Sequence, residues 1–375
     1  MKGLPKPDLC CGCGACADVC PAGAVVMRPD AEGFAHPAAS GAACTHCGLC
    51  ESVCPVLGPA AAGGTLSAYA VTNGSGEELS NSSSGGAFAL LARAVLERGG
   101  AVCGAAMDGG MRVVHRFIES ADELPALMGS KYVQSDAAGA YSKARSYLEY
   151  GREVLFCGTP CQTAALRAYL GRAYAGLTLC GVICHGVPSP LAWRRYLARA
   201  ARGKRPVAAS FRDKRTGWRR YGVSVKTEDG GERFTPAGSD PYMRAFLHDL
   251  DLRPACYDCR FRGTARHADI TLGDFWGAEK LMGPDDDRGI SLLLTHTQKG
   301  EQAAARIEGA SVRRVSAGDA LSFNPAALVS PKKPAERAAF MAELPTRDFA
   351  ELVRKYARES GVSKLKRAVK RLIGR

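Results

Sequence analysis

The chain has 375 residues, of which 46% are hydrophobic and 23% are charged, and its formal net charge is +13. This composition is typical of a folded protein with two or three domains and excludes a disordered or collagenous chain. No run of about 18 apolar residues is present, and the first residues lack the pattern of a secretory signal. We therefore expect a cytoplasmic protein, whose sixteen cysteines serve as metal or cluster ligands rather than as disulfides.

Two cysteine runs near the N-terminus have the spacing of bacterial ferredoxins. The first is Cys10-x2-Cys13-x2-Cys16-x3-Cys20-Pro21, and the second is Cys44-x2-Cys47-x2-Cys50-x3-Cys54-Pro55. In two-cluster ferredoxins, the fourth cysteine of each run binds the cluster of the other run. The spacing therefore predicts one [4Fe-4S] cluster on Cys10, Cys13, Cys16 and Cys54, and a second on Cys44, Cys47, Cys50 and Cys20.

A pair of zinc knuckles is the alternative, but zinc sites use pairs of Cys or Cys and His rather than four-cysteine runs closed by proline. Cys11 is an additional thiol inside the first run, and we predict that it is not a ligand. Residues 24–27 and 33–37 flank a polar turn and predict a short hairpin over the clusters. The small residues of 59–64 predict a linker after this ferredoxin domain.

A serine- and glycine-rich turn at residues 82–86 precedes a predicted helix. The apolar residues Phe88, Leu91, Ala92 and Val95 have helical spacing, and residues 68–72 predict a strand before the turn. Free N–H groups at the start of a helix suit a phosphate. Serine is also an ordinary helix cap, so both interpretations stay open.

Residues 153–190 predict a βαβ unit. The strands are residues 154–157 and 177–183, and the helix begins at Thr159-Pro160 and ends near Leu170. The two strands should be parallel neighbours. Cys161 in the first helical turn and Cys184 after the second strand then lie at the edge where open α/β sheets have their sites.

Cys256 and Cys259 form a further C-x2-C pair. Together with Cys161 and Cys184 they make a set of four, enough for a third [4Fe-4S] cluster. Zinc or a redox dithiol is the alternative. Cys103, Cys157 and Cys180 lie inside predicted strands and are interpreted as small buried hydrophobic residues.

Six stretches follow one another along the chain: residues 82–86 (SSSGG), 129–135 (GSKYVQS), 158–162 (GTPCQ), 184–193 (CHGVPSPLAW), 256–261 (CYDCRF) and 268–277 (ADITLGDFWG). Together they resemble the beta-subunit family of coenzyme F420 hydrogenases and dehydrogenases, with a two-cluster ferredoxin domain placed in front. The resemblance implies a flavoprotein that carries FAD beside an iron–sulfur cluster.

Carried over position by position, the resemblance implies that Cys161, Cys184, Cys256 and Cys259 hold the inner cluster. It also implies which residues line the flavin region: Ser83, Ser84, Gly85, Gly86, Lys131, Tyr132, Gln134, Thr159 and Gln162. Members of the family act on F420 or on other molecules, so the substrate stays open. No catalytic residue is assigned, although His185 and His267 are candidate proton donors by position.

Basic residues are concentrated in two parts of the chain. The first contains Arg194, Arg195, Arg199, Arg202, Lys204, Arg205, Arg212, Lys214, Arg215, Arg219 and Arg220. It predicts an anionic substrate, because guanidinium groups bind phosphate and carboxylate, and a solvated charged surface is the alternative. Residues 363–373 predict a basic amphipathic helix that contacts a membrane surface or a partner, with a frayed terminus as the alternative.

The predicted fold class is a mixture of α+β and α/β with four parts. They are a two-cluster ferredoxin domain at 1–58, an α/β flavin region at 65–150, an α/β domain with βαβ units, an open mixed sheet and the inner cluster at 151–330, and a basic helical tail at 331–375.

The predicted function is that of an oxidoreductase. It passes electrons between [4Fe-4S] clusters and a flavin, and it reduces or oxidises F420 or another soluble anionic substrate, with a redox partner protein or soluble donor. A non-catalytic electron-relay subunit is the alternative. Nucleic-acid binding is less consistent with the sequence, which lacks a pattern of interleaved aromatic and basic residues.

Overall fold

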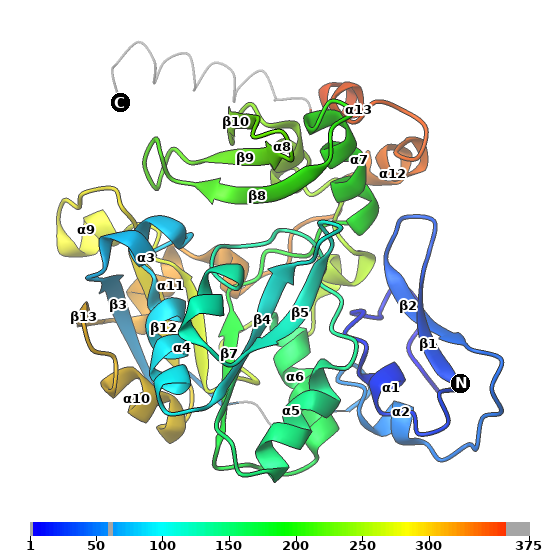
Figure 1. Cartoon of the computed structure of the whole chain (residues 1–375), viewed down its shortest axis with the longest axis horizontal. Coiled ribbons are helices and arrows are strands. Elements are labelled where there is room, and N and C mark those ends of the chain that lie inside the picture. Colours follow the sequence, from blue (N-terminus) through cyan, green and yellow to red (C-terminus); the bar gives the residue numbers. More distant parts are fainter. Residues whose placement is uncertain (1–2, 59–62, 358–375) are drawn as a thin grey trace.

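The computed structural model describes residues 3–58 and 63–357, and its centre is an eight-stranded mixed sheet (Figure 1). The strand order is β13 (Ala310–Val315), β3 (Ser67–Asn73), β12 (Ser291–Thr295), β11 (Ile270–Asp274), β7 (Leu177–Val182), β6 (Val154–Gly158), β4 (Ala101–Met107) and β5 (Val113–Ile118). The four strands from β11 to β4 are parallel, and the outer strands pair antiparallel. The predicted mixed α/β class is confirmed.

The predicted βαβ unit is present as β6, helix α6 (Pro160–Leu170) and β7. Its strands are parallel neighbours, with Cys157 opposite Cys180. Cys103 and Cys180 are buried, as predicted, and Cys157 is partly buried.

Helices cover both faces of the main sheet, because alternate residues of each strand point to opposite faces. Along β4, Ala101 and Cys103 pack with α5 (Ala140–Glu149) and α6. Val102 and Ala106 pack on the other face, with α4 (Ala87–Glu97). Helix α10 (Gln298–Ala305) adds Ala304 to this second face.

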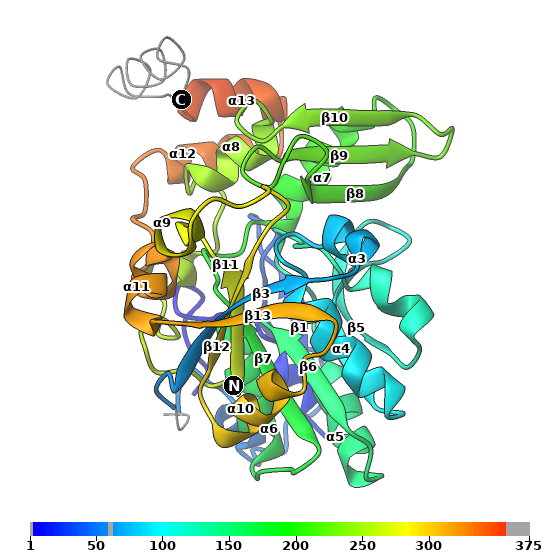
Figure 2. The ribbon, with the colours of Figure 1, turned by 90° about the vertical axis from the view of Figure 1, so that its left-hand side faces the viewer.

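A smaller antiparallel sheet and several helices form a second layer at one end of the main sheet (Figures 1 and 2). It consists of β8 (Pro206–Asp213), β9 (Gly222–Thr227), β10 (Glu232–Pro236), α7 (Pro190–Ala200), α8 (Pro241–Leu247), α12 (Arg337–Glu343) and α13 (Phe349–Tyr356). Aromatic residues fill its core, including Trp193, Phe211, Tyr242 and Phe349. The remaining short helices outside the N-terminal segment are α3 (Gly76–Asn81), α9 (Ala278–Met282), α11 (Ala317–Ser322) and the 3-10 helices η1 (Ala121–Ala126), η2 (Pro254–Asp258) and η3 (Pro325–Ala327).

The N-terminal segment forms a small unit beside α5 and α6 (Figure 1). It contains α1 (Ala15–Asp18), α2 (Leu49–Ser52) and a hairpin of β1 (Val25–Pro29) and β2 (Ala35–Ala39). At the hairpin tip, Phe34 has no exposed surface and belongs to the aromatic core of the second layer. Gly33 lies so close to α7 that a Cβ atom there would be 2.8 Å from the Leu191 nitrogen. The hairpin tip is therefore part of the second layer's core.

Residues 65–150 and 151–330 contribute strands to the same main sheet; the division of the chain into four domains stays a prediction. Helices α12 and α13 lie in the predicted tail, whereas the predicted amphipathic helix at 363–373 lies outside the described residues. Within residues 3–58 and 63–357, no helix has the length and apolar character needed to cross a membrane. The cytoplasmic location stays a prediction.

Candidate functional site

Five cysteines line one cavity at the edge of the main sheet: Cys11, Cys161, Cys184, Cys256 and Cys259. Cys161 is in the first turn of α6, which Thr159 and Gln162 cap reciprocally. Cys184 follows β7, and Cys256 lies in η2 with Cys259 directly after it. The fold thus brings together the four cysteines predicted to hold the inner cluster, and it adds Cys11.

The thiols of this inner cavity are in an environment that disfavours isolated thiolates. Burial raises the pKa of Cys184 to about 12, and it also raises the pKa values of Cys256 and Cys259. A hydrogen bond to Cys11, followed by burial, raises the pKa of Cys161. Metal ligation needs thiolates. The positive charge of bound iron would stabilise the thiolate forms that burial disfavours. Four thiols around one cavity fit the donor set of a [4Fe-4S] cluster.

Three arginines also line the inner cavity, Arg260, Arg262 and Arg266. Arg262 donates from Nη2 to the His185 carbonyl oxygen at 2.7 Å. Arg266 is 4% exposed and donates to the Ala327 carbonyl oxygen at 2.7 Å. Their positive charges would stabilise an anionic group in this cavity.

A second cavity is lined by Cys10, Cys11, Cys13, Cys16 and Cys54. Cys54 comes from the second cysteine run, so the structure brings it to the first three cysteines of the first run. Cys10 Sγ accepts a hydrogen bond from the Gly12 N–H at 3.4 Å. Burial raises the pKa of Cys16 to about 12, which again favours a metal-bound thiolate over a free one.

The other four cysteines of the two runs are less buried. Cys44 and Cys47 are exposed, and Cys20 and Cys50 are partly buried. Across the described ranges 3–58 and 63–357, no three His, Cys, Asp or Glu side chains converge closely enough for a single metal ion. The cysteines thus surround cavities or lie at the surface.

The turn before α4 carries the first residues predicted for the flavin region. Ser83 Oγ accepts a hydrogen bond from the Ser130 N–H at 2.6 Å, and Ser84 Oγ donates to the Ile290 carbonyl oxygen at 2.8 Å. A Cβ atom at Gly85 would be 2.2 Å from the Val71 carbonyl oxygen, and Gly86 has a φ of +80°. Packing of the turn against β3 therefore requires glycine at 85, independently of any ligand.

Cationic side chains surround this turn. Arg212 is buried; it donates to the Ser83 carbonyl oxygen at 3.3 Å and pairs with Asp274 at 3.2 Å. Its guanidinium lies 3.9 Å from the centre of the Tyr221 ring, and its Nε has no hydrogen-bond partner in the described part of the chain. Lys214 donates to the Ser84 carbonyl oxygen at 2.9 Å. Burial lowers the pKa of Lys214 to about 8.

Lys131 and Tyr132 directly follow Ser130, whose N–H donates to Ser83 of the turn. The Lys131 ammonium donates to the carbonyl oxygens of Ala126 and Met128, and burial lowers the pKa of Lys131 to about 7. The Tyr132 ring stacks on Phe246 at 4.9 Å. Buried cations with few carboxylate partners, together with the Arg212 Nε, fit an anionic ligand such as the diphosphate of FAD.

Thr159 and Gln162 connect the inner cavity to His115. Thr159 Oγ1 lies 3.1 Å from Cys161 Sγ, and Gln162 Nε2 donates to Ser135 Oγ at 2.9 Å. Ser135 Oγ lies 2.9 Å from His115 Nδ1. Burial lowers the pKa of His115 to about 4, so its ring is neutral near neutral pH.

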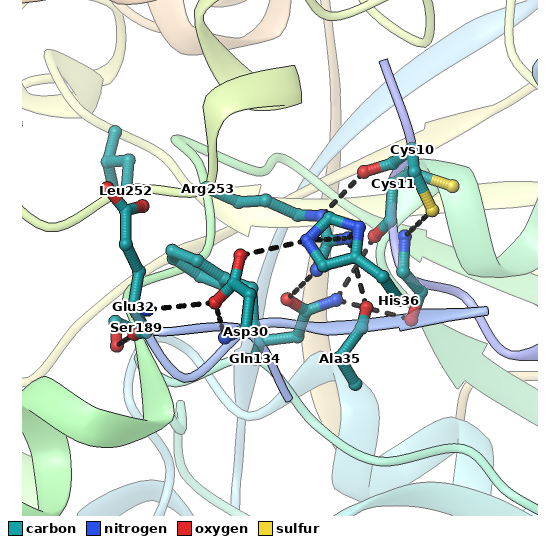
Figure 3. A network of polar contacts seen from close by, with 12 residues as sticks. Cys10, Cys11, Asp30, Glu32, Ala35, His36, Gln134, Ser189, Leu252 and Arg253 are labelled. Carbon is teal, nitrogen blue, oxygen red and sulfur yellow. Dashed lines mark hydrogen bonds and ion pairs between the residues drawn. The ribbon is translucent and has the colours of Figure 1, made fainter. Parts of the chain in front are cut away.

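Gln134, also predicted for the flavin region, contacts the first cysteine loop. Figure 3 shows it between Arg253 and the loop that carries the first cysteines. Its amide nitrogen donates to the carbonyl oxygens of Cys11 and Gly12 at 3.1 and 3.2 Å. Its Oε1 accepts from Arg253 at 2.8 Å. The observed role of Gln134 is to hold this loop against the body of the protein.

Comparisons with known proteins find similarity in two parts of the chain. Residues 151–319 match the family model that describes the C terminus of the coenzyme F420 hydrogenase/dehydrogenase beta subunit, and residues 9–57 match the 4Fe-4S dicluster domain. The chain is also similar to a chain of the F420-reducing [NiFe] hydrogenase complex from Methanosarcina barkeri, at 16% identity and a TM-score of 0.47, with 79% of this chain and 90% of that chain covered. No curated protein matches the chain.

The resemblance recognised in the sequence is thereby confirmed for both parts of the chain. The 4Fe-4S dicluster match contains all eight cysteines of the two runs. The beta-subunit match contains Cys161, Cys184, Cys256 and Cys259, and also Arg212, Lys214 and Asp274. The Ser83 turn and Lys131 lie outside the matched residues.

Many cations of the basic stretch between Arg194 and Arg220 are paired with carboxylates within the protein. Arg199 pairs with Asp348 at 2.6 Å, and Arg205 pairs with Glu228 at 3.0 Å. Lys204, Arg215 and Arg219 also pair with carboxylates. These ion pairs support the alternative of a charged surface, and within the stretch Arg212 and Lys214 reach the Ser83–Ser84 turn.

Sequence reasoning missed Arg253, Arg337 and His115. Arg337 pairs with Glu32 of the hairpin at 2.5 Å, and Arg253 contacts the loop of Cys10. Neither arginine stands in a recognisable motif, and their partners in the N-terminal unit, Cys10 and Glu32, are more than 200 residues away in the sequence. Of the two candidate proton donors, His185 lies 2.6 Å from Asp249, and His267 packs edge-on against Phe261.

Proposed function

We propose that this chain is an iron–sulfur flavoprotein that moves electrons between [4Fe-4S] clusters and FAD, and exchanges electron pairs with F420 or another soluble anion. One observation carries the proposal. The inner cavity adjoins the ferredoxin-type cavity at Cys11, and the Thr159–Gln162 network connects it to His115. Burial and the nearby Lys131 charge lower the pKa of His115, so the end of this network lies close to one of the cations of the proposed flavin site.

The proposed cluster ligands are the three predicted sets. Cys10, Cys13, Cys16 and Cys54 hold one cluster; Cys44, Cys47, Cys50 and Cys20 hold the second; Cys161, Cys184, Cys256 and Cys259 hold the third. The dicluster match supports the first two, and the shared cavity supports the third. The exposed cysteines Cys44 and Cys47 favour the second site as the one that exchanges electrons with a redox partner.

The proposed flavin site is the region around the Ser83–Gly86 turn. Arg212, Lys214 and Lys131 supply positive charge there, and the N-cap residue of α4, Gly86, has no side chain to cap the helix. When bound, a flavin can accept single electrons and release a pair as hydride. The chain's own contribution is to hold the anionic parts of the flavin and of the substrate on these cations. The neutral ring of His115 lies between this region and Cys161.

Strictly anaerobic purification followed by iron, sulfide and flavin counting tests the proposal. We expect about twelve irons per chain, four for each four-cysteine site, and one flavin. Replacing both Cys256 and Cys259 by Ser should remove about four irons and leave the ferredoxin pair. Cys103→Ser, which alters a buried cysteine that lines neither cavity, is the matched control and should keep all the iron.

Flavin content separates the proposal from the electron-relay alternative. Arg212→Gln should reduce the flavin content and leave the iron content unchanged, whereas Arg205→Gln, an exposed ion-paired control, should affect neither. Full iron loading without flavin would favour a relay subunit that serves a partner enzyme. Unchanged iron in the double cysteine variant would refute the third cluster.

A further inference from the structure

Four arginine side chains are buried within residues 3–58 and 63–357: Arg212, Arg253, Arg266 and Arg337. Two of them, Arg212 and Arg337, pair with carboxylates at 3.2 and 2.5 Å. The other two, Arg253 and Arg266, donate to neutral acceptors, and neither has a carboxylate partner in this part of the chain. Both of these lie beside a cysteine-lined cavity. Since a buried charge without a counter-charge is strongly disfavoured, the location of this pair needs an explanation.

The Arg253 guanidinium has no exposed surface, and its hydrogen-bond partners carry no negative charge (Figure 3). It donates to the carbonyl oxygens of Cys10 at 2.6 Å and Ala35 at 3.0 Å, and it lies 3.1 Å from His36 Nδ1. A side-chain amide oxygen at 2.8 Å is a further acceptor. Asp30 Oδ2 lies 3.0 Å from His36 Nε2 and thus contacts this ring rather than the guanidinium. The guanidinium is well supplied with acceptors, but its charge is not balanced.

The guanidinium packs against the backbone of the first cysteine loop. A Cβ atom at Gly12 would lie 2.4 Å from Arg253 Nη1. The N–H of the same Gly12 donates to Cys10 Sγ at 3.4 Å. Arg253 does not line the ferredoxin-type cavity. Its positive charge is therefore separated from that cavity by the loop itself, close enough to act on a charge in the cavity without touching it.

We propose that Arg253 is the fixed counter-charge of the cluster held by Cys10, Cys13, Cys16 and Cys54, and that it raises the reduction potential of this cluster. The inference rests on the proposed function for this set of ligands. A [4Fe-4S] cluster with four thiolate ligands is an anion, and each electron that it accepts makes it more negative. A buried positive charge favours the more negative form. Arginine suits this role, because its guanidinium stays charged at any physiological pH.

The same charge links the redox state of this site to the docking of the N-terminal unit. Arg253 belongs to the body of the protein, whereas Cys10, Ala35 and His36 belong to the N-terminal unit, the last two on strand β2. The attraction that favours the reduced cluster therefore also favours the docked unit. Such a coupling is reciprocal, so the factor by which docking favours reduction equals the factor by which reduction favours docking. Reduction should therefore tighten the contact between the hairpin and the body.

A potentiometric titration with dithionite as the reductant, followed by electron paramagnetic resonance, tests the effect on the potential. Arg253→Met removes the charge, and Arg253→Lys retains it; iron content is measured for both. In Arg253→Met the reduction equilibrium of one cluster of the ferredoxin pair should become about tenfold less favourable, a fall of about 59 mV, and in Arg253→Lys most of the potential should be kept.

The matched control is the double variant Arg337→Gln and Glu32→Gln. It removes another buried arginine that holds the hairpin, together with the carboxylate with which it pairs. Because the net charge does not change, this variant should loosen the hairpin but leave the cluster potentials as they are. A purely structural role of Arg253 would predict the same behaviour for Arg253→Met.

Hydrogen exchange of the unmodified, fully loaded protein tests the reciprocal effect without any substitution. The peptide that covers residues 25–39 reports on the hairpin, in the oxidised protein and after reduction by dithionite under anaerobic conditions. Exchange should be slower in the reduced protein, by about the same factor as the shift in the reduction equilibrium. The difference between the two redox states should disappear in Arg253→Met.

The outcomes separate this inference from the proposed function. An unchanged potential in fully loaded Arg253→Met, or equal exchange in both redox states of the unmodified protein, would overturn the inference alone. If Arg253→Met loses iron, retention of iron in Arg253→Lys supports the role of the charge, and loss in both variants overturns it. An unmodified protein without flavin or the inner cluster would refute those parts of the proposed function and leave the inference intact, whereas one without the ferredoxin pair would overturn both.

Discussion

Replacement of Arg253 by Met removes the buried guanidinium that holds the first cysteine loop against the main body of the protein. Arg253 has no exposed surface. It donates to the Cys10 carbonyl oxygen at 2.6 Å, to Gln134 Oε1 at 2.8 Å and to the Ala35 carbonyl oxygen at 3.0 Å, and it lies 3.1 Å from His36 Nδ1. Methionine fills a similar volume but leaves all four acceptors without this donor.

The expected cost follows from these four interactions. At about 1 kcal/mol for each hydrogen bond lost, the docked loop is destabilised by about 4 kcal/mol. Removing a buried charge also removes its desolvation penalty, so we expect a net loss of about 2–4 kcal/mol. Since 1.4 kcal/mol corresponds to a tenfold change, the opening equilibrium of the loop should increase by about 30- to 700-fold.

Anaerobic hydrogen exchange followed by mass spectrometry measures this opening through the peptide that covers residues 9–18. Arg244→Met is the control, because Arg244 donates to a single carbonyl oxygen, that of Ala357, away from the cysteine loop. The control should leave exchange in residues 9–18 unchanged. If Arg253→Met also leaves it unchanged, the loop is held by other contacts and the argument from Arg253 is wrong.

Three other changes have defined outcomes. Phe34→Ala empties a fully buried position at the hairpin tip and should lower the free energy of unfolding by about 3–5 kcal/mol; Leu57→Ala, at an exposed position, should have little effect in the same denaturation assay. Burial lowers the Lys131 pKa to about 7, so above that pH the Lys131 amine must take up a proton when an anion binds beside it. Calorimetric FAD affinity should therefore fall as the pH rises through 7 in the unmodified protein but not in Lys131→Met. Arg219→Glu replaces a cation that pairs with Glu279, Asp285 and Asp287 by another carboxylate; it should lower the melting temperature, and high salt should restore part of the loss. An altered Michaelis constant with unchanged stability would instead favour a substrate-binding role for Arg219.

The features that the sequence could predict depend on residues close together in the chain. The cysteine spacing predicted the cavity of Cys10, Cys13 and Cys16, and strand and helix patterns predicted that Cys161 and Cys184 reach one sheet edge. The fold of β6, α6 and β7 is local enough for these patterns to be sufficient.

The features that the sequence could not predict depend on contacts between distant segments. Arg253 lies more than 240 residues from Cys10, and nothing near it in the sequence indicates a carbonyl-lined site. Gln134 was predicted beside the flavin because its motif resembles the family, yet its observed contacts are with Cys11, Gly12 and Arg253. The environment of Cys11 likewise depends on Cys161, 150 residues later, so the spacing of the first run alone could only indicate that Cys11 is an additional thiol.

The docking of the N-terminal unit explains why its position matters for electron transfer. Its hairpin tip is buried through Phe34 and paired through Glu32 to Arg337, and its first cysteine loop is held by Gln134 and Arg253. These contacts come from both layers of the body, so they fix the unit at two points rather than through the chain connection alone. A unit fixed in this way keeps Cys11 in the wall of the inner cavity with Cys161, whereas one attached only by its linker would separate the two cavities as it moved. In the proposed electron path, the exposed Cys44 and Cys47 can therefore contact a redox partner while the Cys10 site stays next to the inner cavity.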